Sequence, residues 1–507
     1  PHLFYGTYVG GSGDEYGNEI TVDEEGNTYI TGHSQSLNNI ATSGAFQGVF
    51  NAVFDVFIAK FTPNGNRVWG TYLGGASYDR AYGIDYNNGH LYIVGSTYSP
   101  NMATPGAYQQ FSVDNDDAFI AKFDTTGNRI WFTYYGGDLH DFAAAVVTDN
   151  DENIYLTGHS LSSFNITTAG AHLEFHSGSA GAFLAKFSSN GVLLWGTFYG
   201  NSFEEGWGIA LDNDENPIFS GFTSSTSGIA TAGSHQTTFG GGMDAFLAKF
   251  NQNGARIWGT YFGGSNQDFG YEIDCDSENN IYFVGSTNSS NGIFFNSGYQ
   301  SVPTSIDDGF VAKFSPSGNI LWGTYVGGNE SDYLYGVKNY VNDGVLVAGL
   351  TQSSENIATA GAYKDFLSGQ YDAFVLKLSP NGELEWGSYY GGTLSDEARG
   401  IAINPSNAYF TIVGFTMSNS GVSSPGAHQE SFSGGFFDVF VAKFCAPIFP
   451  ELNYNFNEDI CANEDAVLGV VSPSLYNFLE WNTGSTSNTV DLNVLPVGSY
   501  VFYVNSL

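Results

Sequence analysis

Short stretches rich in hydrophobic residues, many alternating with polar ones, are separated by turn-forming residues along most of the chain. In one clear example they lie at 271–276, 280–285, 308–314 and 319–328, with Gly, Asn, Asp and Ser between them. A period of two residues is typical of half-buried β-strands, and no helical period lies between these stretches. The pattern predicts an all-β chain of many short antiparallel strands.

The pattern repeats at a fixed interval. The motif WGTYLGG begins at Trp69, and copies follow at intervals of 62 to 64 residues. These copies begin at Trp131, Trp195, Trp258, Trp322 and Trp386, and an earlier one places Tyr5 in the same position. Four short strands in each unit of about 60 residues are typical of a propeller blade.

The two ends of the array predict how the ring closes. Residues 2–11 read as the fourth strand of a unit, and the last unit stops after its third strand at 438–444. Six complete units and a seventh assembled from both ends predict a seven-bladed β-propeller over residues 1–444. An N-terminal strand that completes the last blade leaves no open edge at the closure.

The motifs also carry a family resemblance. The fourth unit contains GIALD, NPIFSGFTSS, IATAGSHQ, DAFLAKF and ARIWGTYFGG, and this combination resembles the SBBP β-propeller repeat family. The match covers about residues 1–444. That family occurs mostly in secreted or surface proteins of bacteria and archaea and has little assigned activity. The resemblance therefore implies a propeller and an extracellular or cell-surface location, and it implies no particular reaction.

The repeat ends before residues 445–507. EWNTGSTSNTVDL and GSYVFYV in this tail resemble the small immunoglobulin-like or PKD-like β-sandwiches of bacterial surface proteins, which often stand near the sorting domain of type IX secretion cargo. We therefore expect an incomplete sandwich here, in a longer protein that is type IX cargo. Cys445 and Cys461 are close enough in sequence for one disulfide, which would indicate an oxidising compartment.

Charge narrows the classes of partner. The chain has 51 acidic and 14 basic residues and a formal net charge of −37. Such a surface repels nucleic-acid phosphates and anionic lipid headgroups, and it attracts cations or basic partners. No apolar run is long enough to cross a membrane, and no signal peptide begins at Pro1. We expect a mature or trimmed chain, a monomeric propeller, and no nucleic-acid partner.

Half of the basic residues occupy one position of one motif, DAFLAKF at 244–250 and its copies. They are Lys60, Lys122, Lys186, Lys249, Lys313, Lys377 and Lys443. If Asn253-Gly254 forms the centre of a type I′ turn, Lys249 lies directly opposite Trp258. An ammonium above an indole gains about 0.5–2 kcal/mol. This arrangement predicts a structural brace in every blade, rather than a ring of lysines that binds an anionic ligand.

Two details extend this prediction. No tryptophan follows Lys443, so its expected partner is Tyr5, brought beside it by ring closure. An acidic residue also recurs before each first strand, and we expect it to cap its own loop. These acids are Glu15, Asp79, Asp141, Glu204, Asp268, Asp332 and Asp396.

Metal-ligating patterns are weak. The turns Asp149–Asn153 and Asp212–Asn216 both read DNDEN, whose alternating oxygens can hold Ca²⁺, but a hairpin turn is the simpler interpretation. His172, Glu174 and His176 alternate in HLEFH and could present a zinc site on one face of an extended segment. We assign no catalytic, cofactor or metal residue and expect no cofactor, with Ca²⁺ as the alternative.

The loops between the second and third strands differ most between units. They span about twenty residues, as at 225–243, and propeller topology places them on the same face as the GGxxxD loops. Binding usually resides on such variable loops. The leading hypothesis is therefore a non-enzymatic secreted or surface protein that binds a protein or glycan, for example in adhesion. The alternatives are an extracellular enzyme acting on polysaccharide, which needs converging carboxylates where the repeat fails, and a structural spacer in a surface filament.

Overall fold

The computed structural model describes residues 1–445 apart from 52, 114–115, 341–343 and 405–408, together with five short strands between 452 and 506. Contacts divide the chain into two units, Pro1–Ala446 and Pro447–Leu507. In the described part of the chain, no helix is long and apolar enough to span a membrane.

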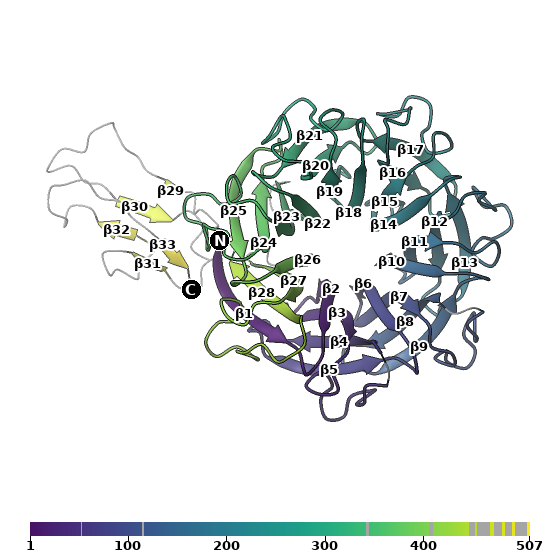
Figure 1. The fold of residues 1–507 in the computed structure, drawn as a ribbon, viewed down its shortest axis with the longest axis horizontal. Helices are drawn as coiled ribbons and strands as arrows, with labels where there is room; N and C mark the ends of the chain where they lie inside the picture. The colour runs from purple at the N-terminus through teal and green to yellow at the C-terminus, as the bar shows by residue number, and fades with distance from the viewer. Residues whose placement is uncertain are drawn as a thin grey trace. The chain divides into compact units, whose positions relative to one another are not determined.

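The first unit is a seven-bladed β-propeller whose four-stranded antiparallel sheets are arranged in a ring (Figure 1). Residues from all seven blades line a cavity at its centre, which we call the central channel. The first strand of each blade lies innermost, where it contacts the first strands of neighbouring blades. Six blades are consecutive in the chain: β2–β5, β6–β9, β10–β13, β14–β17, β18–β21 and β22–β25. The seven-bladed all-β prediction is therefore confirmed.

The bounds of the propeller strands are β1 (His2–Val9), β2 (Glu15–Val22), β3 (Thr28–Ser34), β4 (Asp55–Phe61), β5 (Arg67–Leu73), β6 (Asp79–Asn87), β7 (His90–Thr97), β8 (Asp117–Asp124), β9 (Arg129–Tyr135), β10 (Asp141–Thr148), β11 (Ile154–Ser160), β12 (Gly181–Phe187), β13 (Leu193–Tyr199), β14 (Glu204–Leu211), β15 (Pro217–Thr223), β16 (Asp244–Phe250), β17 (Arg256–Phe262), β18 (Asp268–Cys275), β19 (Ile281–Thr287), β20 (Asp308–Phe314), β21 (Ile320–Val326), β22 (Asp332–Tyr340), β23 (Gly344–Thr351), β24 (Asp372–Leu378), β25 (Leu384–Tyr390), β26 (Asp396–Ile403), β27 (Tyr409–Thr416) and β28 (Asp438–Cys445). Their second and third strands are almost wholly buried, because both faces of each sheet pack against neighbouring blades.

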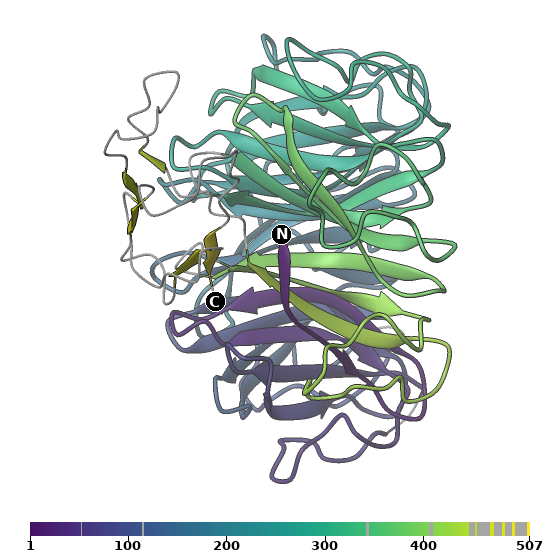
Figure 2. The ribbon, with the colours of Figure 1, turned by 90° about the vertical axis from the view of Figure 1, so that its left-hand side faces the viewer.

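The ring closes as the sequence predicts. The seventh blade has the order β1-β28-β27-β26, so the N-terminal strand is its outer strand. Figure 2 shows β1, in purple, beside the yellow-green strands that come last in the propeller sequence. Tyr5 faces Lys443 in this pairing, which confirms the register expected at the closure.

The second unit contains two small antiparallel sheets among its described residues. One has the order β29-β30-β32 and the other pairs β31 with β33. The bounds are β29 (Leu452–Asn453), β30 (Val467–Val470), β31 (Leu479–Trp481), β32 (Thr489–Asp491) and β33 (Val504–Ser506). The immunoglobulin-like or PKD-like class stays a prediction. Cys461 lies outside the described residues, and so does its predicted disulfide with Cys445.

The hairpin between the third and fourth strands has the predicted register but a different turn. Lys249 faces Trp258, and the corresponding pairs form in the other blades. A type I′ turn needs positive φ at both central residues, whereas here Gly254 has φ +81° and Asn253 is not in that region. The register shifts directly after Lys249. The turn is therefore of the three-residue type with a glycine bulge, which Asn251 Oδ1 supports by accepting the N–H groups of Asn253 and Ala255.

The predicted contact of the lysine with tryptophan is wrong. Lys313 Nζ lies 2.9 Å from Asp276 Oδ2, and 4.6 Å from the ring centre of Tyr282 on the second strand. Lys249 Nζ lies 2.6 Å from Asp212 Oδ2. A carboxylate is a stronger partner for an ammonium than an indole face is, and the lysine accordingly points towards the turn between the first two strands. In four blades the lysine thus braces its own blade through the acid of this turn. Lys122 instead pairs with Glu152 of the next blade, Lys377 with Glu385 of its outer strand, and Lys443 with the carbonyl of Pro63.

The tryptophan instead joins its blade to the next. Trp258 Nε1 donates to the carbonyl of Pro316 at 3.1 Å, and its ring packs against Gly318. A Cβ on Gly318 would approach this ring to 2.8 Å, so the contact requires glycine. The same bond to the following blade is made by Trp69, Trp131, Trp195 and Trp322.

The recurrent acids cap their loops as predicted. Asp79 Oδ2 accepts the N–H of Gly75 at 2.8 Å and the hydroxyl of Ser99 at 2.8 Å. Six of these acids also lie near an aspartate that begins the preceding blade's third strand, as Asp79 does near Asp55; at Glu204 that position is Gly181. Burial, and then mutual repulsion, raise the pKa of Asp55 to about 7, and burial raises that of Asp79 to about 6.

Candidate functional site in the central channel

A β-bulge in each innermost strand changes which residues face the channel: the fourth residue lies there in every blade, and the fifth adds a side chain there in three strands, with Glu19, Ala145 and Glu272. In β2 the register shifts between Gly17 and Glu19, so Asn18 has no partner on β3. Shifts occur at the same place in β6, β10, β14, β18, β22 and β26. A bulge re-aims a side chain that regular pairing would direct elsewhere. The fourth and fifth residues of these strands are thereby available to the channel.

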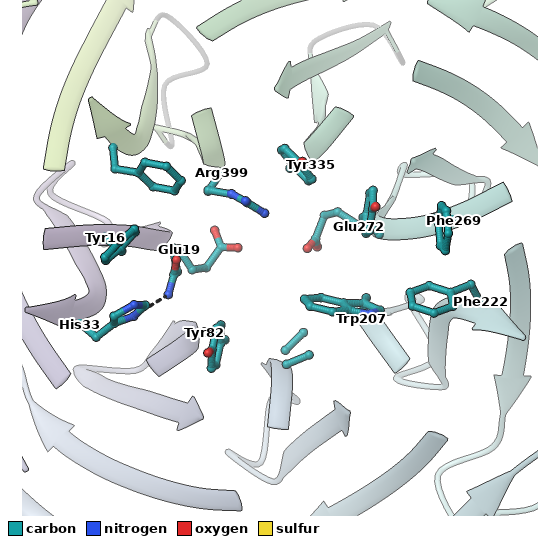
Figure 3. A pocket seen from close by; sticks show the side chains of 15 residues that line it. Tyr16, Glu19, His33, Tyr82, Trp207, Phe222, Phe269, Glu272, Tyr335 and Arg399 are labelled. Carbon is teal, nitrogen blue, oxygen red and sulfur yellow. Dashed lines mark hydrogen bonds between the residues drawn. The ribbon is translucent and has the colours of Figure 1, made fainter. Parts of the chain in front are cut away.

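The fourth residues surround an upper chamber of about 500 Å³ (Figure 3). We call it upper because it lies towards the loop face, which carries the GGxxxD loops and the loops between second and third strands. The seven residues are Asn18, Tyr82, Ala144, Trp207, Tyr271, Tyr335 and Arg399. Although the surrounding sheets repeat, these positions do not, which is expected of a site for an asymmetric ligand.

Aromatic rings dominate this chamber. Tyr271 lies with its ring centre 5.2 Å from Tyr335 and 6.1 Å from Trp207. Trp207 Nε1 donates to Glu205 Oε2 at 3.1 Å, which fixes the indole. Further rings behind them complete the wall: Tyr16, His33, Phe222, Phe269 and Phe415. Rings held on strands give the chamber a rigid apolar lining.

Glu19 and Glu272, at the fifth position, lie at the boundary between the upper chamber and a second cavity below it, which we call the lower chamber. Figure 3 shows their carboxyl groups pointing into the channel from opposite sides. Burial is the main cause that raises the pKa of both carboxyls, and Glu272 is raised further by repulsion from Glu19 and Asp274. Lys338 opposes the shift in both.

The seventh residues of the innermost strands line the lower chamber: Thr21, Asp85, Val147, Ala210, Asp274, Lys338 and Ala402. Asp85 accepts the backbone N–H of Thr148 at 2.8 Å, and Asp274 accepts that of Asn339 at 2.7 Å. These bonds tie neighbouring blades together, so both aspartates have a structural role. The surrounding carboxylates raise the pKa of Lys338 despite its burial and keep it charged.

Arg399 completes the polar lining of the upper chamber. Its guanidinium forms an ion pair with Glu397 and lies 4.0 Å from the ring centre of Tyr335. The positive charge of Arg399 is therefore matched by an acid of its own strand, and its planar group extends the aromatic wall.

The residues singled out from the sequence as metal candidates do not converge. Asp149 accepts the N–H of Asn153 at 2.7 Å and lies 3.3 Å from Lys186, and Asp212 closes its turn in the same way. His172 packs against Phe250, whereas His176 packs against Phe198 and Glu174 accepts the N–H of Gly170. Among the described residues, no group of three or more His, Cys, Asp or Glu side chains is placed to hold a metal ion.

Sequence reasoning missed the channel residues. The two most regular motifs of the repeat, DAFLAKF and WGTYLGG, lie on the third and fourth strands, whereas Glu19, Trp207 and Glu272 lie on the first. The signal in the sequence that could have identified them is the difference between units. The first strands share an acidic first residue, but their fourth residues include five different types. The bulge that brings both the fourth and fifth residues to the channel has no such signature.

Comparison with known proteins agrees with this architecture. Three segments match the SBBP β-propeller repeat. They are residues 5–41, 130–165 and 257–293. An uncharacterized WD repeat-containing protein of Acanthamoeba polyphaga mimivirus is 24% identical over 363 residues, which span 58% of this chain and 26% of that protein. The regulatory protein FlaEY of Caulobacter vibrioides is 23% identical over 351 residues, 65% of this chain and 35% of that protein. The match thus spans about a third or less of these curated relatives.

Similarity to solved structures is found at low identity. Sqt1 from Chaetomium thermophilum is 9% identical with a TM-score of 0.41, covering 87% of this chain and 99% of that one. Hydrazine synthase from Kuenenia stuttgartiensis is 8% identical with a TM-score of 0.42, covering 78% and 91%. Virginiamycin B lyase from Staphylococcus aureus is 10% identical with a TM-score of 0.36, covering 71% and 94%.

Proposed function

We propose that this chain is a non-enzymatic binding module, secreted or displayed on the cell surface as type IX cargo, that recognises a protein or glycan in adhesion. The partner approaches the loop face and places a ligand group in the upper chamber. The observation that carries this proposal is the loss of sevenfold repetition at the chamber. Residues with a purely structural role can be of the same type in every blade. The seven residues that surround the upper chamber instead include five different types.

The rigidity of the chamber supports binding. Its side chains stand on β-strands, and both Trp207 and Arg399 are held by neighbouring acids. A site built on strands needs little reorganisation when a ligand enters, so less conformational entropy is lost. The volume of about 500 Å³ is typical of pockets for small ligands or single side groups.

This proposal is tested by measuring the binding of the protein to arrays of glycans and peptides and to cell surfaces. We expect at least one ligand whose binding is reduced at least tenfold by Trp207→Ala. Ile257→Ala is the control, because Ile257 is an exposed apolar residue of the outer strand β17 and belongs neither to the chamber nor to the loop-face loops. If every ligand bound the wild type and the Trp207 variant equally, the chamber would not be the binding site.

An enzyme acting on extracellular polysaccharide is the second candidate. The specific observation in its favour is that two carboxyls with raised pKa, Glu19 and Glu272, face one chamber, as a general acid and its partner would. Incubation of the protein with polysaccharides, followed by measurement of reducing ends, tests it. Turnover that is lost in both Glu19→Gln and Glu272→Gln would favour the enzyme, and absence of turnover favours the binding module.

A further inference from the structure

We propose that the ligand group taken by the upper chamber is an organic ammonium, seated between Glu19 and Glu272 with its carbon body against the aromatic wall. This inference deepens the proposed function and rests on it. The chamber and its rings define the place, and the two acids define the charge of the ligand group.

The aromatic wall favours a cation. The faces of Trp, Tyr and Phe rings carry negative electrostatic potential and attract a positive group within about 6 Å of the ring centre. Trp207 and Tyr271 stand next to Glu272 in the lining, and Figure 3 shows Trp207 and Tyr335 around its carboxyl group. A cation at this carboxyl would therefore gain both a charged partner and aromatic faces.

Neither acid at the boundary forms a close ion pair among the described residues, although the charge of Lys338 acts on both. Among the described residues, no ion pair joins Glu19 or Glu272 to a basic side chain within 4.0 Å. Arg399 is paired with Glu397. Lys338 lies in the lower chamber, where its single positive charge is shared among four acids: Asp274, Glu272, Glu19 and Asp85. Two partly desolvated carboxyls facing each other are costly, and a bound ammonium would relieve that cost.

Other ligand classes fit less well. An anion would meet Glu19 and Glu272, and the chain as a whole carries a net charge of −37, so approach and binding are both opposed. A neutral ligand would pack on the rings but would desolvate the two carboxyls without giving them a charged donor. An ammonium satisfies both parts of the lining, because its N–H groups form charge-assisted hydrogen bonds.

Three probes of similar size and different charge test the inference: phenethylamine, 2-phenylethanol and phenylacetate. We expect calorimetry at pH 8 to show that the amine binds at least tenfold more tightly than the alcohol and that phenylacetate does not bind. Nα-acetyl-lysine amide, measured beside them, distinguishes a lysine side chain of a protein partner from a free small amine as the natural source of the group.

Variants separate this inference from the proposed function. Glu272→Gln keeps the shape of the side chain and should reduce the preference for amine over alcohol to about threefold or less, while alcohol binding is retained. Glu25→Gln, on an exposed turn, should change neither. Equal binding of amine and alcohol to the wild type, both lost in Trp207→Ala, would overturn the ammonium inference and leave the chamber as a binding site. Binding of all probes unaffected by Trp207→Ala would overturn both.

The pH dependence of binding provides a second readout. Amine affinity should fall as the pH drops from 8 to 6, because protons compete for the carboxyls, and the fall should be smaller in Glu272→Gln. The charged groups that face this region are Glu19, Glu272, Asp85, Asp274, Lys338 and Arg399. An amine affinity that does not change between pH 8 and 6 would contradict the seat between the two acids.

Discussion

Lys443 Nζ donates a hydrogen bond to the carbonyl of Pro63 at 2.9 Å, and this bond crosses the closure of the ring. Five other blades use a tryptophan N–H for the equivalent bond to the next blade. At the closure Tyr5 replaces the tryptophan. Its ring packs on Gly65 as the indoles pack on their glycines, but its hydroxyl does not make this bond. The lysine supplies the missing donor.

Lys443→Met should therefore destabilise the closure. The carbonyl of Pro63 would lose its donor, which costs about 1–3 kcal/mol of the free energy of unfolding. Urea denaturation followed by tryptophan fluorescence measures this. Lys377→Met is the control, because its partner Glu385 is 40% exposed and such pairs contribute about 1 kcal/mol or less. A larger loss in the Lys377 variant would argue against the role assigned to Lys443.

Lys249→Met should lower the free energy of unfolding more than Lys443→Met or Lys377→Met does. Asp212, whose side chain is 1% exposed, would lose its cation and remain buried. Removing one partner of a buried pair typically costs about 3–5 kcal/mol. The double variant Lys249→Met/Asp212→Asn should recover part of this loss, because the neutral side chain can still accept the N–H of Asn216. A double variant no more stable than the single one would show that the charge of Asp212 is not the cause.

The requirement for glycine beneath each tryptophan ring can be tested by comparing two Gly→Ala variants. Gly254 and Gly233 both have positive φ, +81° and +85°, so alanine strains the backbone at each by about 1 kcal/mol. A Cβ at Gly254 would lie 2.9 Å from the ring of Trp195, whereas one at Gly233 meets nothing within 4 Å. Gly254→Ala should lower the free energy of unfolding by a further 1–3 kcal/mol or so. Equal losses would mean that the indole moves aside freely.

Stability should rise as the pH falls from 8 to about 5. Carboxyls with a raised pKa in the folded state, such as Asp55 at about 7, bind protons more tightly when folded. Below the unfolded pKa, near 4, the charge penalty of such a group is absent, and it is fully present above the folded pKa. Thermal unfolding from pH 4 to 8 measures this window.

Asp55→Asn tests whether the buried carboxyl pairs cause this pH dependence of stability. Asp55 Oδ1 is buried without a hydrogen-bond partner beside Asp79, and both carboxyls lie against Gly74. An amide there can donate to Asp79, so the variant should be more stable than the wild type by about 1–3 kcal/mol at pH 8 and should depend less on pH. Asp124→Asn should instead destabilise slightly, because its turn holds the pKa of Asp124 below the usual range.

The sequence was sufficient for the architecture because strand patterning and turn residues recur in register seven times. It also predicted which residues face each other, as with Lys249 and Trp258. It did not predict which of its two neighbours, Asp212 or Trp258, the side chain of Lys249 contacts. The two lie on opposite sides of Lys249, and strand register does not determine the conformation of a long side chain. The channel could not be predicted from shared motifs, since Glu19 and Glu272 lie where the units differ.

The closure has a consequence for how the chain folds during synthesis. Within the propeller β1 is the first strand to be made, and its partner β28 follows more than four hundred residues later. The register of β1 with β28 is therefore the longest-range pairing in the propeller. Contacts of such sequence separation form slowly, and an unpaired edge strand is open to pairing with other chains in the meantime. Until β28 is synthesised, β1 is therefore the propeller strand most in need of protection from such pairing.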